Sequence, residues 1–227
     1  MGENNIHSTA VLEGEIRMGS GNEIGPHCTL IGPLTLGDDN VIGPSAVIGT
    51  RGDEIWKRRY DTSGKRVEIG SRCTIREHVT VHKPCYGEVT TIGDDAYLMH
   101  GSYVAHDAQV SDRAILAQNT AIGGVSFVLE GGYLAMGGAL HQRAVLGHYA
   151  IVAAAAAAVR DVRPFTRFIP GGPVSVNEYA VERYGFTELS DQIGRYVRDG
   201  ITPSDDRLAA MVAEYEELHA ASGRGEY

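Results

Sequence analysis

An aliphatic residue recurs at every sixth position over most of the first 152 residues. The period is interrupted at residues 50–66 and at residues 83–88. The repeating positions are Ile6, Leu12, Met18, Ile24, Leu30, Leu36, Ile42, Ile48, Ile69, Ile75, Val81, Ile92, Leu98, Val104, Val110, Leu116, Ile122, Val128, Leu134, Leu140, Leu146 and Val152. A helix would show apolar spacings of three and four, and a sandwich strand would alternate every two residues. A period of six instead predicts a solenoid of short parallel strands.

Each hexad supplies one short strand and one turn, so three hexads, about 18 residues, form one triangular coil. The fifth residue of the hexads is mostly small, which predicts that it points inward. Cys28, Cys73 and Cys85 all occupy this position and are interpreted as core residues. The alanine-rich run 153–158 keeps the register and is interpreted as the last coil. The pattern therefore predicts an all-β solenoid over residues 1–160.

The composition changes after residue 160. Prolines and glycines predict a linker over residues 161–173. Beyond the linker, apolar residues recur with helical spacing at Leu189, Ile193, Tyr196 and Val197, and again at Leu208, Met211, Val212, Tyr215 and Leu218. This spacing predicts a C-terminal region over residues 174–227 with two or three helices packed beside the solenoid. Thr202 is the expected cap of the last helix, with Pro203 in its first turn.

Composition and charge exclude several classes of protein. Glycine accounts for 29 of the 227 residues, nearly twice its usual share of about 7%, which fits a fold with many turns. The net charge of −9 argues against nucleic-acid binding, which normally needs a basic surface. No apolar run approaches the ~20 residues that span a bilayer, and no signal segment is recognisable, so we expect no membrane span and a cytoplasmic location. The three cysteines lack metal-ligand spacing, so neither a disulfide framework nor a structural zinc site is expected.

Candidate chemistry lies at the turns of the solenoid. His106 occupies the third position of its hexad and should point outward, and a coil of three hexads would stack it with Gly124 and Gln142. Imidazole can take a proton near neutral pH, because its ordinary pKa is about 6.5. A glycine N–H could stabilise an oxyanion there. Asp107 is interpreted either as the residue that orients the imidazole or as a turn residue.

Several local strings resemble one known family over residues 6–186. The resembling segments are His7-Ser8-Thr9-Ala10, Ile24-Gly25-Pro26-His27-Cys28, Arg66-Val67-Glu68-Ile69-Gly70, Arg76-Glu77-His78-Val79-Thr80-Val81-His82, Val104-Ala105-His106-Asp107, Ile115-Leu116-Ala117, Leu140-His141-Gln142, Val176-Asn177 and Arg183-Tyr184-Gly185-Phe186. Together they resemble the UDP-N-acetylglucosamine O-acyltransferases of lipid A biosynthesis, which are hexapeptide-repeat acyltransferases. The resemblance implies a left-handed parallel β-helix with a short C-terminal α-helical region. It also implies homotrimers and direct transfer of a (hydroxy)acyl chain from acyl carrier protein to the 3-hydroxyl of UDP-N-acetylglucosamine or a related nucleotide sugar.

The resemblance also implies roles for individual residues. His106 matches the catalytic base, Gly124 the oxyanion-hole glycine, His141 and Gln142 a pair lining the substrate cleft, and Asn177 and Arg183 nucleotide-sugar contacts. No cofactor or metal is expected, because the acyl chain arrives on the phosphopantetheine of the carrier protein. An acyl-chain groove is expected at Met136 and Ala154, which should stack in one column with Gln118.

Three positions depart from the family pattern. Tyr103 and Val125 stand where the family has histidines around the cleft, and Tyr184 replaces an arginine before Gly-Phe. Tyr103 is therefore taken as a substrate-binding residue of this chain. Because the departures surround the sugar nucleotide, the resemblance supports acyl transfer more strongly than any one acceptor, and a divergent paralogue with another hydroxyl or amine acceptor fits too.

Other functions also fit the pattern. The repeat would suit an acetyltransferase or acyltransferase with a different acceptor or a coenzyme A donor, and a non-catalytic trimer is a further possibility. A γ-type carbonic anhydrase would use histidines from two chains to hold zinc, and His78, His82, His100, His106 and His141 raise this possibility without reproducing the expected spacing. The basic run Trp56, Lys57, Arg58, Arg59 and Lys65 is either a solvated loop or a lip that attracts the acidic carrier protein.

Overall fold

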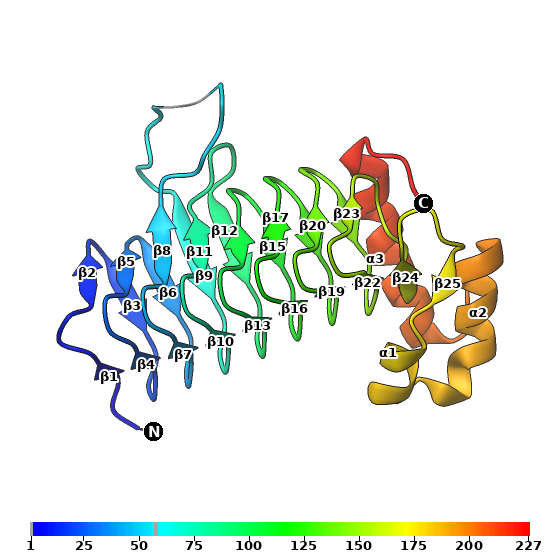
Figure 1. Cartoon of the computed structure of the whole chain (residues 1–227), viewed down its shortest axis with the longest axis horizontal. Helices are drawn as coiled ribbons and strands as arrows, with labels where there is room; N and C mark the ends of the chain where they lie inside the picture. The colour runs from blue at the N-terminus through cyan, green and yellow to red at the C-terminus, as the bar shows by residue number, and fades with distance from the viewer. Residues whose placement is uncertain (1, 57–58) are drawn as a thin grey trace.

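A triangular prism of three parallel sheets forms most of the molecule, with helices at its C-terminal end (Figure 1). The computed structural model describes residues 2–56 and 59–227. The chain winds as a parallel β-helix, as the repeat predicts, and the β-helix is left-handed, as the resemblance implies. Within the described ranges, no helix is long and apolar enough to cross a membrane.

The strands of each sheet follow one another along the prism. Sheet A contains, in order, β1 (Asn5–Ile6), β4 (Glu23–Ile24), β7 (Val41–Ile42), β10 (Thr74–Ile75), β13 (Tyr97–Leu98), β16 (Ile115–Leu116), β19 (Tyr133–Leu134), β22 (Ile151–Val152), β24 (Thr166–Phe168) and β25 (Ser175–Val176). Sheet B contains β2 (Val11–Glu13), β5 (Thr29–Ile31), β8 (Val47–Thr50), β11 (Thr80–His82), β14 (Tyr103–Val104), β17 (Ala121–Ile122), β20 (Ala139–Leu140) and β23 (Ala157–Ala158). Sheet C contains β3 (Ile16–Met18), β6 (Leu34–Leu36), β9 (Arg66–Ile69), β12 (Val89–Ile92), β15 (Gln109–Val110), β18 (Phe127–Val128) and β21 (Val145–Leu146).

The hexads explain the stacking. Tyr103 pairs with Ala121 and Ala121 with Ala139, so a regular coil consists of three hexads. The first residue of each hexad points into the prism, and Leu98 and Leu116, for example, are fully buried. The fourth residue takes a left-handed conformation at corner after corner, often without being glycine. This conformation turns the chain sharply from one sheet to the next.

The solenoid extends further than the sequence predicts. Val162 pairs with Leu146, and β24 continues sheet A beside β22, so the last coil runs through Phe168. The predicted linker over residues 161–173 therefore begins only after β24. The hexad pattern does not reveal this coil because the coil is two residues shorter than three hexads. Ile151 pairs with Arg167, and three full hexads would place its partner two positions later.

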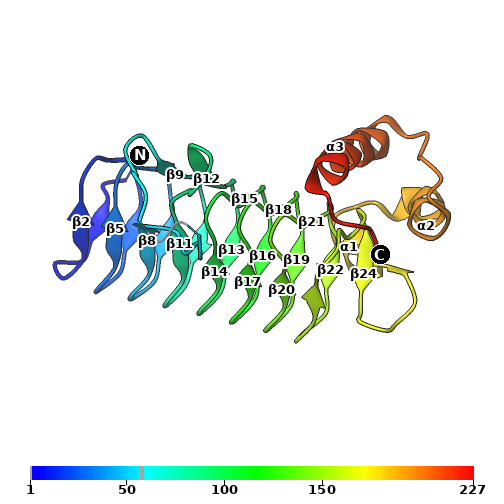
Figure 2. The same cartoon turned by 90° about the horizontal axis from the view of Figure 1, so that it is seen from above.

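The C-terminal region contains α1 (Glu178–Arg183), a 3₁₀ turn (Thr187–Leu189), α2 (Ser190–Asp199) and α3 (Asp206–Ser222). Figure 2 shows α3 lying over the end of the prism near β18 and β21. The buried Asp161 fixes this helix, because its carboxylate accepts hydrogen bonds from His219 Nδ1 and Ser222 Oγ, both at 2.6 Å. The cap of α3 is Asp205, whose carboxylate accepts the backbone N–H groups of residues 207 and 208, and not Thr202 as predicted.

Candidate active site

A cavity of about 630 Å³ lies where sheet B turns toward sheet C. Its floor includes the outward side chains of β14, β17 and β20, and its other wall is the loop after β8. The lining includes five predicted site residues, namely Tyr103, His106, Gly124, His141 and Gln142. The structure thus brings together residues that lie up to 39 positions apart in the sequence.

His106 and Asp107 form a hydrogen-bonded pair at this corner. His106 Nδ1 lies 2.8 Å from Asp107 Oδ2. The Asp107 carboxylate also accepts the backbone N–H groups of Cys85, Tyr86 and Gly87 at 2.6–3.2 Å. Burial alone would raise the pKa of Asp107, but these hydrogen bonds outweigh it and lower the pKa to about 2.

Both interpretations of Asp107 therefore hold. The residue has φ +62° and makes the turn, and its carboxylate also orients the imidazole. Because an ionised carboxylate only accepts hydrogen bonds, the Nδ1 atom of His106 must carry the proton. In the neutral imidazole the Nε2 atom is then the hydrogen-bond acceptor.

His106 is buried, although its position in the hexad predicts an exposed side chain. It does point outward from the prism, but the loop after β8 crosses over it and leaves it 5% exposed. Gly52 makes this crossing possible: a Cβ atom at residue 52 would lie 2.6 Å from His106 Cβ and 2.8 Å from Cys85 Sγ. On the cavity side, Glu54 Oε2 lies 3.8 Å from His106 Nε2.

Gly124 lies directly against the imidazole. A Cβ atom there would be 2.3 Å from His106 Cε1 and 2.5 Å from Nε2. The predicted stacking is confirmed, because Val125 N–H donates to His106 O and Arg143 N–H donates to Gly124 O. Among the described residues, the Gly124 N–H donates to no backbone carbonyl, so it is available to a ligand in the cavity.

Tyr103 has a partner that the hexad pattern does not reveal. Its hydroxyl lies 3.2 Å from Nδ1 of His82, a buried residue on the preceding strand of sheet B. Burial, together with the charges of Asp53 and Cys85, raises the pKa of Tyr103 to about 12. The phenol is therefore neutral near pH 7 and can donate a hydrogen bond. β11 pairs with β14 so that Tyr103 lies opposite Thr80, and His82 follows two residues later on the same strand. The regular spacing of 18 residues does not give this neighbour, because the insertion after β11 separates the paired residues by 23 positions.

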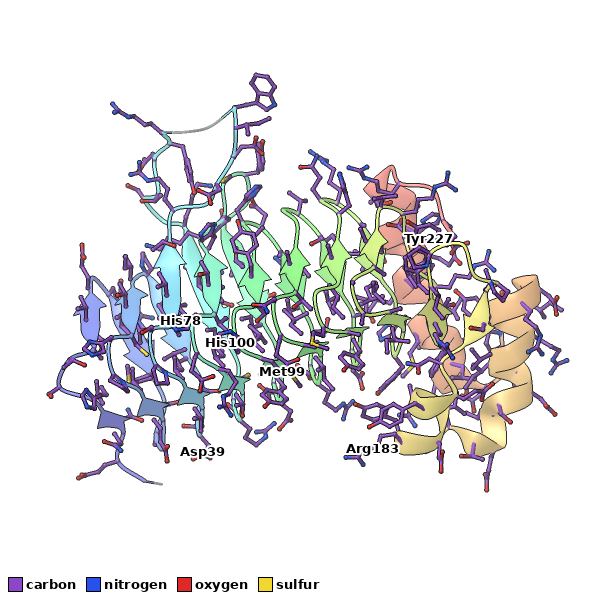
Figure 3. The ribbon with its side chains drawn as sticks, in the orientation of Figure 1. Asp39, His78, Met99, His100, Arg183 and Tyr227 are labelled. Carbon is purple, nitrogen blue, oxygen red and sulfur yellow. The ribbon has the colours of Figure 1, made fainter. Side chains whose placement is uncertain are left out.

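Asn177 and Arg183 do not reach this cavity within one chain. Asn177 is buried in the C-terminal region, where its Nδ2 atom donates to Tyr149 O at 2.7 Å. Arg183 is exposed at the end of α1, well away from the loops after β8 and β11 (Figure 3). The expectation that both contact the substrate is thus not met by residues of a single chain.

Met136 and Ala154 stack as predicted, on the other edge of sheet B. Gly137 N–H donates to Gln118 O and Ala155 N–H donates to Met136 O. Both predicted groove residues are exposed, Met136 by 58%, and so is Gln118 in the same column. Within one chain they form a surface stripe and no closed groove.

Cys85 differs from the prediction. It is buried, but it lies outside the prism, beside the His106–Asp107 pair, in the short loop after β11. Its backbone N–H donates to Asp107. The described residues contain one group of potential metal ligands whose ligating atoms all lie within 4.8 Å of one another, namely Cys85, His106 and Asp107. His78 and His100, whose rings contact edge to face at the turn from sheet A to sheet B, are exposed and do not line the cavity (Figure 3). The zinc arrangement of a carbonic anhydrase is thus not formed within the described chain.

The basic run after β8 is only partly at the cavity. Trp56 lines it and is 84% exposed, whereas Lys57 and Arg58 lie outside the described residues. Lys65 Nζ donates to Gly87 O at 2.7 Å, so this lysine ties the two loops together.

A larger hollow of about 820 Å³ lies on sheet C beside α3 and contains none of the predicted residues. Its lining includes His148, which is buried and whose ring nitrogens have no hydrogen-bond partner among the described residues. Burial lowers the pKa of His148 to about 4, even though Glu214 Oε2 lies 3.3 Å from its Nε2 atom.

Solved structures with the same fold include several acyltransferases, whereas no family model matches the sequence. The UDP-N-acetylglucosamine acyltransferase of Francisella novicida is 21% identical, with a TM-score of 0.78 over 98% of this chain and 91% of that one. LpxA of Acinetobacter baumannii is 22% identical, with a TM-score of 0.67 over 94% and 95% of the two chains. The UDP-N-acetylglucosamine O-acyltransferase of Moraxella catarrhalis is 23% identical, with a TM-score of 0.66 over 97% and 98%. From end to end of its described residues, this chain has the fold of the UDP-N-acetylglucosamine acyltransferases.

Proposed function

We propose that this protein is an acyltransferase that moves a (hydroxy)acyl chain from acyl carrier protein to the 3-position of UDP-N-acetylglucosamine or a related nucleotide sugar. The observation that carries the proposal is the His106–Asp107 pair, which lies against Gly124 in a cavity. This arrangement supplies a base, a residue that orients it and a backbone donor at one point, as acyl transfer requires.

The geometry supports direct transfer. His106 Nε2 takes the proton of the acceptor as it attacks the thioester carbon, and Asp107 stabilises the imidazolium that forms. In this proposal the Gly124 N–H stabilises the oxyanion of the tetrahedral intermediate. When the C–S bond breaks, His106 returns the proton to the sulfur of the phosphopantetheine.

Cys85 is the one thiol beside the base, and its surroundings argue against a covalent role. It is 2% exposed and does not line the cavity, and the backbone of Gly52 packs over its sulfur. An acyl group on Cys85 would have no space, so the acceptor attacks the thioester itself in this proposal.

The proposal includes a homotrimer. The cavity is open on one side, and Asn177, Arg183, Met136 and Ala154 lie outside it in one chain. A neighbouring prism would close the cavity and could bring its own copies of these residues to it. Light scattering should therefore give the mass of a trimer, and an active monomer would contradict this part of the proposal.

The test is a product analysis by mass spectrometry. Purified protein is incubated with a panel of acyl carrier proteins, acyl-coenzyme A donors and UDP-sugars, and each acylated sugar is identified. His106→Ala and His106→Gln should lower turnover by about 10²- to 10⁴-fold, with circular dichroism confirming that both variants fold. His7→Ala, which changes an exposed histidine outside the site, is the matched control. Near wild-type turnover in both His106 variants would remove the base from the mechanism.

A further inference from the structure

A carboxylate faces the nitrogen that must accept the proton. Glu54 comes from the loop after β8, and its side chain is only 12% exposed beside His106. Its Oε1 atom accepts the backbone N–H of Trp56 at 3.2 Å. The other oxygen, Oε2, lies 3.8 Å from His106 Nε2.

Hydrogen bonds keep this carboxylate ionised. The backbone N–H of Trp56 and then the hydroxyl of Tyr86 hold the pKa of Glu54 below its ordinary value. The ionised Glu54 side chain thus accepts hydrogen bonds, and so does the Nε2 atom of His106 whenever His106 acts as the base.

The two acceptors are spaced for one shared donor atom. At 3.8 Å they do not hydrogen bond to each other, but an atom of the substrate about 2.9 Å from each would bridge them. A hydroxyl has one hydrogen and can donate to only one of the two acceptors. Its oxygen lone pairs would then face the lone pairs of the other acceptor, which is unfavourable. A primary amine has two hydrogens and can donate to both.

We infer that Glu54 selects an acceptor whose reacting group is a primary amine, such as a nucleotide sugar with an amino group at the 3-position. The inference rests on the proposed acyl transfer and defines its acceptor. The neutral amine attacks the thioester carbon, so a C–N bond forms and the C–S bond breaks. One amine proton passes through His106 Nε2 to the leaving sulfur, which departs as a thiol. The second proton stays on the nitrogen of the amide product and donates to Glu54 throughout.

The experiment is a competition between two acceptors that differ at one atom. UDP-N-acetylglucosamine and its 3-amino analogue are offered together with an acyl carrier protein donor, and the ester and amide products are separated by mass spectrometry and by the alkali stability of the amide. We expect kcat/KM for the amine to exceed that for the hydroxyl by about 10- to 100-fold, the usual effect of one charge-assisted hydrogen bond.

Variants then assign the preference to Glu54. Glu54→Gln and Glu54→Ala should reduce the preference about tenfold or more, whereas Asp61→Asn, which removes an exposed carboxylate from the same loop, should leave it unchanged. A wild-type enzyme that prefers the hydroxyl, or Glu54 variants with the wild-type ratio, would overturn the inference and leave the acyl transfer intact. If neither sugar is acylated with any donor, the proposed function itself fails, and the inference fails with it.

Discussion

Asp107→Asn tests whether one buried carboxylate supports both the fold and the base. Asp107 Oδ2 accepts hydrogen bonds from the backbone N–H of Cys85 and from Nδ1–H of His106, while Oδ1 accepts one from the backbone N–H of Gly87. Asparagine has one oxygen and one NH₂ group in place of the two oxygens. In either orientation its NH₂ group must face a backbone N–H, so a buried donor loses its partner.

The structure gives the magnitude. The pKa of Asp107 falls from its ordinary 3.8 to about 2, and about 1.36 kcal/mol per pKa unit makes this about 2 kcal/mol of stability. Because the folded-state pKa is the lower one, this stability is fully present above pH 4 and is lost as the pH falls toward 2. Asp107→Asn should therefore lower the free energy of unfolding at pH 7 by this same amount, about 2 kcal/mol. The difference between the two proteins should vanish near pH 2.

Urea denaturation followed by circular dichroism at several pH values measures this difference. The same variant should lower kcat by about 10²-fold, because the imidazolium loses its carboxylate. Asp38→Asn is the matched control: Asp38 also accepts a backbone N–H at a turn, from Ser20, but it is exposed and far along the chain from the site. Equal stability of wild type and Asp107→Asn at pH 7, or a difference that persists at pH 2, would refute the reasoning.

Three further predictions use other parts of the chain. Gly124→Ala should lower kcat at least tenfold without dissociating the proposed trimer, because its Cβ would displace the His106 ring. Gly225→Ala is the control and should have no effect on kinetics, because its Cβ would have its nearest neighbour at 3.8 Å. The free energy of unfolding should rise with pH between about 4 and 6.5, because His148 takes up a proton more readily when unfolded; His148→Gln should flatten this part of the profile in urea titrations, and an unchanged slope would contradict the assignment. If the stripe at residue 154 limits the acyl chain in the proposed trimer, Ala154→Met should shorten the preferred chain and Ala154→Gly should lengthen it, and an identical chain-length profile in both would place the limit elsewhere.

The periodic part of the molecule could be predicted from the sequence. From Ile24 onward the coils bury the same hexad positions, so the aliphatic period predicts the three sheets and the stacking of His106 under Gly124. The prediction failed where the period changes. The last coil is shorter than three hexads, and Phe168 therefore falls outside the expected register although it is buried like a hexad residue.

Contacts made by irregular segments could not be predicted. The cap of α3 is Asp205, since the residues before it are held by Gln192 of α2, whose Oε1 atom accepts N–H groups of Ser204 and Asp205. Local preference favoured Thr202, but this tertiary contact decides where the helix begins. The burial of His106 has the same origin, because the residues that cover it belong to a loop with no period.

The positions of the loops after β8 and β11 explain why the cavity beside His106 forms at the turn from sheet B to sheet C. Paired residues in β7 and β10 are 33 positions apart, and those in β11 and β14 are 23 apart, so both coils exceed three hexads and contain an insertion, the longer one first. Both insertions follow a strand of sheet B, which is the turn that His106 occupies in a later coil. An insertion at this turn leaves the strand pairs before and after it intact, so the solenoid tolerates changes in its length and sequence. The regular coils hold His106 and Gly124 in place, while the inserted loops bring Glu54 and the backbone donors of residues 85–87 to them. In the proposed acyl transfer, the choice of acceptor should therefore change with the loops while the geometry of His106 and Gly124 stays the same.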